Sequence, residues 1–579
     1  MVRFCPICGS YIPESRHYCI RCRKQNIDQP PNQRRNIDPS KLTVIDILNS
    51  FPSSSLRTYQ KEVLTKAVEA FQTGQKCIII SAPTGFGKSY VNAAFCSMTP
   101  SFYATPQLAL IAQIQNDPLL KSGFVEIKGR QNYRCHHYPT RSVSLGRCET
   151  EDYPCKERFN VCPYWVQKKR AIDAQSILLS FAYLIGESQT EGVTDTYLGS
   201  RNLLVLDEAH NIEEQCLNQI SVRVSPYTLP KKVYGRFFPQ LLKVETEDEL
   251  KTILEELSEH LQRILQQTEK IAEATGLTTL EAAEKERIAR YLENYHLYTV
   301  SKSEWIWQIQ QDQLTLQPVF STEFIKSSVW KRANYYIISS ATILDPKMYT
   351  ELNGLNDLLA DDEICFLQPP TIFPVQNRPI IDKTVGPLSK DEWAHNRKSA
   401  LQAVEEILRK EKGNVAIHCH SYRHQQWIAE NLPKDLQPRL VVHSSKDREE
   451  KLDEWKQKLG RVFVSVAFSE GQDWKYDICD AQILLKVPFP DLGDKRIRRR
   501  LDLGYRQWYY LQSMLGVIQA YGRAIRAEDD KARFYIVDGS FKRLARQCWR
   551  SIPEWFKEAL PSSIYDLKSS EGINMNIIP

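Results

Sequence analysis

The sequence predicts an α/β protein with two parallel-sheet domains, and three observations support this fold class. The 579-residue chain exceeds the roughly 250–300 residues at which a single hydrophobic core stops growing. Short β-branched runs alternate with amphipathic helical stretches over 42–345, and again over 346–579. One run leads into a glycine-containing turn that ends in Lys88-Ser89. We therefore expect two sheets wound with helices, the first of which binds a nucleotide.

Composition sets broad limits on function. The chain is 42% hydrophobic and 25% charged, with a net charge of +6, which is typical of a globular protein and permits an anionic partner without requiring one. No charged-then-apolar leader opens the sequence, and no apolar run is long enough to span a bilayer. We expect a monomer without a membrane partner, cytoplasmic and nucleoid-associated if the source is prokaryotic or viral.

The first 24 residues carry two C-x-x-C pairs separated by ten residues. Two such hairpins allow four thiolates to converge on one tetrahedral ion, so we expect a small zinc-binding unit over 1–24 rather than a redox dithiol. A segment rich in Gln, Asn, Pro and Arg follows and predicts a linker over 25–41. The expected zinc ligands are Cys5, Cys8, Cys19 and Cys22.

The nucleotide site is predicted from the stretch 77–89. An apolar run over 77–81 indicates a buried strand, and the turn after it places Lys88 and Ser89 at the start of a helix. Backbone N–H groups of such a loop bind phosphate, Lys88 reaches the β- and γ-phosphates, and the Ser89 hydroxyl holds Mg²⁺. The first glycine of the usual pattern is Ala82 here. The loop residues assigned to the nucleotide are Thr84, Gly85 and Gly87.

A second cysteine quartet interrupts the α/β pattern over 129–166. Its spacings are wide and irregular, unlike those of a zinc ribbon, and the segment has little apolar periodicity. Four thiolates select zinc or an iron–sulfur cluster, and spacing alone does not decide between them. The expected ligands are Cys135, Cys148, Cys155 and Cys162.

An acidic pair follows the apolar strand at 202–206. Because ligands of parallel sheets lie at the carboxyl ends of the strands, Asp207 is expected to hold Mg²⁺ and Glu208 to polarise the attacking water. Beyond the pair, apolar residues recur at helical spacing over 246–298 without a catalytic constellation. We expect a helical insert within 217–330.

The second domain ends in a helix that is expected over 515–526. The i, i+4, i+7 spacing of Gln519, Arg523 and Arg526 predicts that all three lie on one face of this helix. Presented to a nucleotide on the other domain, the two arginines would stabilise charge on the γ-phosphate during transfer.

A basic stretch with nearby aromatics offers a nucleic-acid contact. It can neutralise phosphates and stack bases, although a solvated helix face is an equally good interpretation. Its members are Lys495, Arg496, Arg498, Arg499, Arg500, Tyr505, Trp508 and Tyr509.

Six motifs in order resemble the XPD/DinG group of superfamily 2 DNA helicases. The resemblance spans nearly all of 55–545, with the cysteine quartet and the helical insert where the group carries its iron–sulfur and arch domains. The motifs are Arg57-Thr-Tyr-Gln60, Ala82 to Ser89, the D-E-A-H box at 207–210, Ser340-Ala-Thr342, Ser469 to Asp473, and Gln519 to Arg526.

This resemblance implies two RecA-like domains with ATP and Mg²⁺ between them and a [4Fe–4S] cluster in the quartet. It implies that Arg57 and Gln60 contact the adenine side and that Asp473 lies near the interface. It further implies 5′→3′ stepping on single-stranded DNA and unwinding of forked duplexes, in repair, recombination or nucleic-acid defence, within a larger complex if one forms.

Several features depart from the group. The chain and its arch are small, the quartet spacing is unusual, and the zinc segment has no counterpart in the family core. Two other functions therefore stay open. One is an ATP-gated nucleic-acid-binding accessory subunit without unwinding activity, and the other is an RNA-directed motor.

Overall fold

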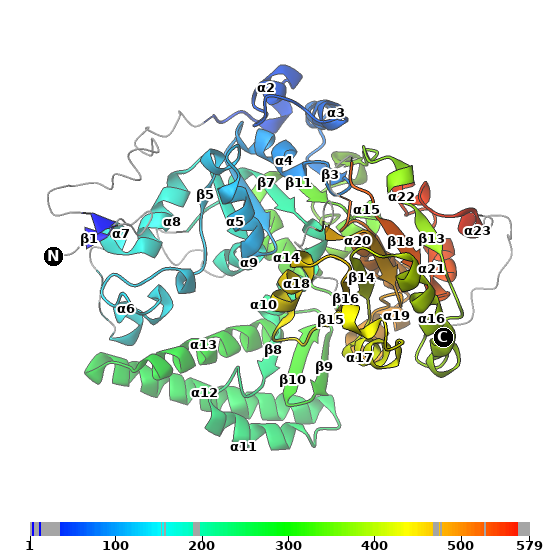
Figure 1. Ribbon diagram of the computed structural model, residues 1–579. Helices are drawn as coiled ribbons and strands as arrows, with labels where there is room; N and C mark the ends of the chain where they lie inside the picture. Colours follow the sequence, from blue (N-terminus) through cyan, green and yellow to red (C-terminus); the bar gives the residue numbers. More distant parts are fainter. Residues whose placement is uncertain are drawn as a thin grey trace.

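Two parallel sheets, each covered by helices, form the body of the molecule in the computed structural model (Figure 1). The structure describes residues 3–4, 11–12, 35–151, 153, 155, 158–188, 197–466, 474, 478–525 and 529–565. The expected α/β class with two wound sheets is confirmed. Residues 3–4 and 11–12 form a short antiparallel pair, and the predicted zinc ligands lie outside the described residues.

The first sheet has seven parallel strands in the order β12-β3-β11-β7-β4-β6-β5. Its β-branched and aromatic strands are buried on both faces, which is typical of parallel sheets wound with helices. The sheet takes in β12, which lies beyond the boundary at 345 that the sequence suggested. Its strands are β3 (Cys77–Ser81), β4 (Ser101–Thr105), β5 (Val125–Glu126), β6 (Ser176–Ser180), β7 (Arg201–Asp207), β11 (Ala333–Ser340) and β12 (Ile364–Leu367).

The helices that build the nucleotide site belong to this first domain. Two of them flank the phosphate loop, and two others face the second domain. They are α3 (Gln60–Gln72), α4 (Lys88–Cys96), α10 (Ile212–Ile220) and α15 (Pro346–Leu352).

The second sheet has six parallel strands in the order β13-β18-β17-β14-β16-β15. Two helices of this domain, α19 (Lys495–Asp502) and α20 (Arg506–Tyr521), lie toward the first domain. The strands are β13 (Ile380–Asp382), β14 (Val415–His418), β15 (Leu440–Val442), β16 (Val462–Ser465), β17 (Ala481–Leu484) and β18 (Arg533–Ile536).

The insert after the acidic pair is a long helical hairpin on a small antiparallel sheet. Helices α12 (Glu247–Thr275) and α13 (Thr279–Val300) each begin with a capping box and pack on β8 (Val222–Val224), β9 (Trp305–Gln310) and β10 (Gln313–Pro318). In Figure 1 the hairpin extends beneath α6 (Arg147–Thr150), which carries Cys148. The backbone N–H of Leu277 at the hairpin turn donates to the carbonyl of Thr150, which joins the arch to the cysteine-bearing segment.

Residues 35–41 are held against the first sheet. The Asn202 amide donates to Asn36 Oδ1 at 2.7 Å, and the Tyr335 hydroxyl donates to Asp38 Oδ1 at 2.9 Å. Asn202 and Tyr335 lie near the starts of β7 and β11. Residues 35–41 of the expected linker are therefore fixed at the amino-terminal ends of the strands, on the side of the sheet opposite the nucleotide site.

Candidate active site

The phosphate loop links β3 to α4 and is shaped by two glycines. Gly85 and Gly87 have φ values of +79° and +83°, which favour glycine, and Gly87 caps the helix that begins at Lys88. The Gln60 amide donates to the carbonyl of Phe86 at 2.7 Å, and the Arg57 guanidinium donates to that of Gly85. The side chains expected on the adenine side thus also hold the loop backbone in place.

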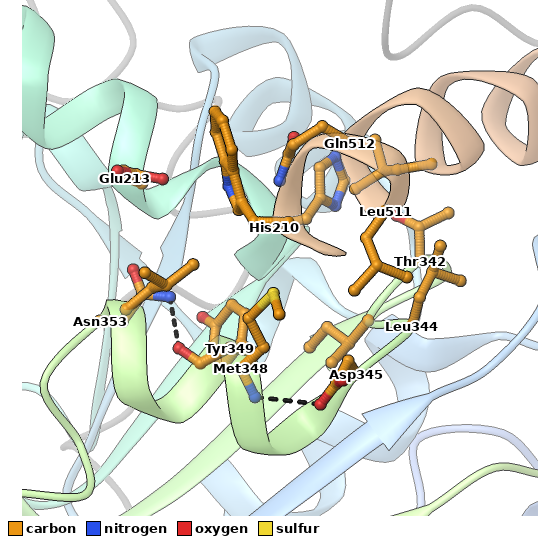
Figure 2. A pocket seen from close by; sticks show the side chains of 14 residues that line it. His210, Glu213, Thr342, Leu344, Asp345, Met348, Tyr349, Asn353, Leu511 and Gln512 are labelled. Atoms are coloured by element: carbon orange, nitrogen blue, oxygen red, sulfur yellow. Dashed lines mark hydrogen bonds between the residues drawn. The ribbon is translucent and has the colours of Figure 1, made fainter. Parts of the chain in front are cut away.

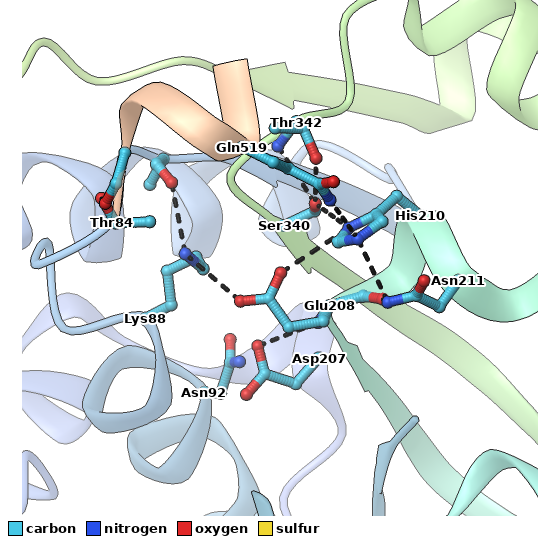
Figure 3. Close-up of polar contacts among 12 residues, drawn as sticks. Thr84, Lys88, Asn92, Asp207, Glu208, His210, Asn211, Ser340, Thr342 and Gln519 are labelled. Atoms are coloured by element: carbon cyan, nitrogen blue, oxygen red, sulfur yellow. Dashed lines mark hydrogen bonds and ion pairs between the residues drawn. The ribbon is translucent and has the colours of Figure 1, made fainter. Parts of the chain in front are cut away.

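Lys88 and Glu208 face each other at the carboxyl edge of the first sheet. Lys88 Nζ donates to the carbonyl of Ala82 at 3.3 Å and lies 3.8 Å from Glu208 Oε1 (Figure 3). Glu208 has a left-handed backbone, with φ of +51°, which turns its side chain away from the strand direction toward Lys88. Such strain at a non-glycine residue is typical of functional sites.

Asp207 is held by hydrogen bonds to both of its carboxylate oxygens. Oδ2 accepts from the Tyr103 hydroxyl at 2.7 Å, and Oδ1 accepts from the backbone N–H of Glu208 at 3.1 Å. Burial, together with the neighbouring Glu208 carboxylate, raises the pKa of Asp207 to about 6. A buried carboxylate of this kind is a suitable ligand for a hard cation such as Mg²⁺.

His210 connects the acidic pair to the second domain. Its Nδ1 lies 2.8 Å from Ser340 Oγ, and its Nε2 lies 3.1 Å from Asn211 Nδ2 and 2.8 Å from Gln519 Nε2. Both partners of Nε2 are amide nitrogens, which can only donate, so Nε2 must accept. These contacts therefore favour the tautomer with its proton on Nδ1. Gln519 belongs to α20, so this network crosses between the domains (Figure 3).

A second contact joins the phosphate loop itself to the other domain. The Thr84 hydroxyl donates to the carbonyl of Gly522 at 3.1 Å, directly after the end of α20. A Cβ at Gly522 would lie 3.2 Å from Thr84 Oγ1, so glycine permits this close approach. A movement of the phosphate loop away from the end of α20 would therefore break this hydrogen bond.

The prediction of one helical face for Gln519, Arg523 and Arg526 is wrong. Helix α20 ends at Tyr521, where Gly522 N–H bonds back to Ile518 and Arg523 N–H to Ala520 in a tighter turn. Arg523 is buried beyond this end, with its guanidinium 5.7 Å from the Trp474 ring centroid. Arg526 and Asp473 lie outside the described residues.

A small cavity lies beside His210, at the contact between the two domains, which we call the domain seam. It has a volume of about 70 Å³, and Figure 2 shows Met348 and Tyr349 of α15 across it from Leu511 and Gln512 of α20. His210 and Glu213 also line it. The seam is thus incompletely packed between the His210–Gln519 contact and the Glu213 side chain.

The four central cysteines lie close enough to interact electrostatically. The Cys148 pKa is raised by burial, then by Glu149 and by the thiols of Cys155, Cys135 and Cys162. Cys162 is the N-cap residue of α8 (Pro163–Asp173), and a Cβ at Gly146 would meet Cys135 Sγ at 2.9 Å.

A metal geometry is not formed there. Within the described part of the chain, no group of three or more His, Cys, Asp or Glu is arranged to hold a metal ion. The thiols shift one another's pKa values without forming a metal geometry, because electrostatic effects act over longer distances than metal–ligand bonds. The donor set of four thiols fits an iron–sulfur cluster or zinc in its chemistry, and it would have to contract around either.

Only part of the basic stretch at 495–500 is open to solvent, because Lys495 and Arg498 are exposed while Arg500 is buried. Arg496 and Arg500 pair with Glu213 of α10, and Arg499 pairs with Glu304. Lys495 Nζ lies 4.1 Å from the Trp307 ring centroid. Both the DNA-binding interpretation and the solvated-face interpretation are wrong for Arg496 and Arg500, because α19 packs against the first domain and the arch.

The structure has two RecA-like domains, with the phosphate loop and the acidic pair at the carboxyl ends of the strands of the first sheet. A helicase C-terminal domain family model matches residues 404–559, and the DEAD_2 family model matches residues 128–229. A solved XPD helicase is similar with a TM-score of 0.61 and 14% identity, covering 86% of this chain and 98% of its own. S. tokodaii Xpd4 is similar with a TM-score of 0.56 and 15% identity, covering 87% and 100%. These structural similarities establish the fold alone.

Sequence relatives include two homologues of regulator of telomere elongation helicase 1. The Drosophila ananassae protein is 29% identical over 145 residues and the Drosophila melanogaster protein 31% identical over 125 residues. The matches cover 22% and 19% of this chain, but only 14% and 13% of those relatives' lengths. In motif order, fold and both family matches, the chain is similar to superfamily 2 helicases of XPD/DinG type.

The helicase family models imply the use of ATP and Mg²⁺. Among the residues that the structure describes, no helix is long and apolar enough to cross a membrane.

Proposed function

We propose that this protein is an ATP-driven DNA helicase that steps along single-stranded DNA and opens duplexes. The observation that carries the proposal is the pair of contacts across the domain seam, His210 to Gln519 and Thr84 to Gly522. They join the acidic pair and the phosphate loop directly to the second domain. A change in the bound phosphates can therefore alter how the two domains contact each other, which is what a stepping motor requires.

We assign the following roles to the nucleotide residues. Lys88 binds the β- and γ-phosphates, while Ser89 and Asp207 hold Mg²⁺, which neutralises developing charge when bound. Glu208 lies between Lys88 and His210, so its carboxylate is placed to orient the attacking water and accept its proton. Gln519, Arg523 and Arg526 act from the second domain, with Asp473 near the interface, and Thr84, Gly85 and Gly87 shape the loop.

The central quartet is proposed to hold a [4Fe–4S] cluster. Cys135, Cys148, Cys155 and Cys162 would supply the four thiolates, and the N–H groups at the start of α8 favour negative charge on Cys162. Protein purified without air should be brown, with absorbance near about 400 nm. Colourless protein with two zinc equivalents would overturn this assignment.

The N-terminal segment is proposed to bind one zinc ion through Cys5, Cys8, Cys19 and Cys22. Metal analysis should find one zinc equivalent that is lost in Cys8→Ser, while absorbance from the central quartet is retained. A Cys8→Ser protein with unchanged zinc content would contradict the proposal.

Unwinding of tailed duplexes tests activity, polarity and substrate together. We expect ATP hydrolysis that is stimulated by single-stranded DNA, and separation of DNA duplexes with a 5′ tail in preference to a 3′ tail. Lys88→Ala should abolish both activities, because the γ-phosphate loses its cation. Strand separation that persists in Lys88→Ala, or that is absent from the intact protein, would contradict the proposal. Faster unwinding of RNA duplexes would assign an RNA-directed motor.

An ATP-gated binding subunit without unwinding activity is the second candidate. It is favoured by the pairing of Arg496, Arg499 and Arg500 with Glu213 and Glu304, which neutralises part of one candidate DNA surface. DNA-stimulated ATP hydrolysis without strand displacement, on a duplex that a related helicase separates, would support this candidate over the motor.

A further inference from the structure

A tyrosine hydroxyl lies against Asp207, one of the two side chains that are expected to hold Mg²⁺. Tyr103 is fully buried, and its hydroxyl donates to Asp207 Oδ2 at 2.7 Å. Asn92 Nδ2 donates to the same hydroxyl at 3.4 Å. None of the recognised motifs includes Tyr103 or Asn92, and Figure 3 shows Asn92 beside Asp207.

Strand register explains how the phenol reaches this position. Strand β4 pairs in parallel with β7, with Tyr103 opposite Val205, two residues before Asp207. Because side chains alternate along a strand, Tyr103, Val205 and Asp207 point to the same face of the sheet. The Phe124 ring packs edge-on against Tyr103, with centroids 5.2 Å apart, and fixes the direction of the ring.

The helix of the phosphate loop completes the arrangement. Asn92 lies one turn after Lys88 on α4 and is fully buried. Its amide reaches the Tyr103 hydroxyl from the helix side, while Asp207 accepts from the strand side. The hydroxyl therefore acts as acceptor toward α4 and as donor toward β7, so it links the two elements that carry Ser89 and Asp207.

We propose that Tyr103 is a positioning residue for the Mg²⁺ site. With Oδ2 held by Tyr103 and Oδ1 held by the Glu208 backbone, the plane of the Asp207 carboxylate is fixed in advance. Each oxygen keeps a lone pair for the cation, and no side-chain rearrangement opposes metal binding. The proposal rests on the proposed function, because it takes Ser89 and Asp207 as the Mg²⁺ ligands.

The test is the Mg²⁺ requirement of Tyr103→Phe. This variant keeps the ring against Phe124 and removes only the hydroxyl. Binding of a fluorescent ADP analogue is measured in EDTA and then during a Mg²⁺ titration. We expect unchanged affinity in EDTA, and a Mg²⁺ concentration for half-maximal tight binding that is about 10-fold higher or more, since loss of such an orienting partner typically costs 10–100-fold.

Tyr335→Phe is the matched control. Tyr335 lies on β11 of the same sheet, which is separated from β4 by β7, and its hydroxyl also donates to an aspartate, Asp38 Oδ1, at 2.9 Å, away from the nucleotide. Its Mg²⁺ titration should match that of the wild-type protein. A folded Tyr103→Phe with the wild-type Mg²⁺ requirement would overturn the proposal.

Asn92→Ala provides a second variant in case Tyr103→Phe does not fold. It removes the amide that orients the hydroxyl, so we expect a smaller shift of the Mg²⁺ titration in the same direction. No shift in this variant would count against Tyr103. If the wild-type protein binds Mg²⁺-nucleotide but fails to unwind DNA, the proposed function fails while the titrations still decide the role of Tyr103.

Discussion

Glu213 of the first domain and Arg500 of the second form a buried ion pair. The Arg500 side chain is 0% exposed and that of Glu213 18% exposed, and Arg496 contacts the same carboxylate. The Arg500 guanidinium is also stacked between aromatic rings, 4.6 Å from the Phe320 centroid and 4.5 Å from that of Trp508. Glu213 follows the acidic pair on α10, so this contact anchors the domain seam close to the nucleotide site.

Removing the Glu213 charge should destabilise the protein. Glu213→Gln leaves two largely buried arginines without their counter-ion, and we expect a loss of about 3–5 kcal/mol in the free energy of unfolding. Denaturant titration measures this loss. Glu304→Gln, which breaks the exposed pair with Arg499, is the control and should cost less than about 1 kcal/mol. Equal losses in the two variants would contradict this assignment.

The same pair should respond to acid. Burial opposes ionisation of Glu213, but Arg500 and Arg496 hold its pKa below the ordinary value of 4.5. A carboxylate with a lower pKa in the folded chain contributes stability above the unfolded pKa, and loses it as the pH falls through the folded value. The melting temperatures of wild type and Glu213→Gln should therefore differ at neutral pH and converge below 4.5. A difference that persists in acid would argue against the ion pair.

Arg523 should support hydrolysis more than nucleotide binding. An arginine that stabilises the transferring phosphoryl group typically contributes about 10³-fold or more to kcat, so Arg523→Ala should lose that factor while still binding ATP. Steady-state ATP hydrolysis and equilibrium binding separate the two effects. Arg409→Ala, which removes a half-exposed arginine of the same domain, should leave both unchanged. Parallel losses of binding and turnover in Arg523→Ala would refute this role.

Alanine substitutions at Gly87, in the phosphate loop, and at Gly74, outside it, distinguish backbone strain from a steric clash with a neighbouring side chain. A Cβ at Gly87 would lie 2.6 Å from Gln60 Nε2, whereas one at Gly74 would meet nothing within 4 Å, and both positions have positive φ. Each alanine should cost roughly 1 kcal/mol of stability through its left-handed backbone. Only Gly87→Ala should also lose nucleotide affinity, because Gln60 must move away from the loop. Normal ATP binding by Gly87→Ala would show that the loop tolerates the change.

The motif residues of the first domain were predictable because local chemistry determines them. A buried strand, a glycine turn and Lys88-Ser89 lie within thirteen residues of sequence, and the structure forms the expected strand, loop and helix there. The acidic pair at the end of β7 likewise follows from one apolar run. Such elements carry their own start and stop signals.

The rest depends on contacts between distant residues. Arg500 and Glu213 are 287 positions apart, so the sequence shows a basic stretch but not the partner that buries it. The early end of α20 at Tyr521 coincides with the contact between Gly522 and Thr84, which periodicity alone does not reveal. Tyr103 was missed because a tyrosine in an apolar strand resembles any other core residue.

The hydrogen bond between Leu277 and Thr150 joins the tip of the arch to the cysteine-bearing segment. Both the arch and the cysteine-bearing segment are rooted in the first domain, so their contact makes a continuous ring of chain. Among the described residues, the closure includes that hydrogen bond and a small apolar cluster of Ala272, Leu277 and Ala282 with Leu145. Because each segment is braced by the other, the arch cannot swing away from the cysteine-bearing segment without losing this hydrogen bond and exposing the apolar cluster to water.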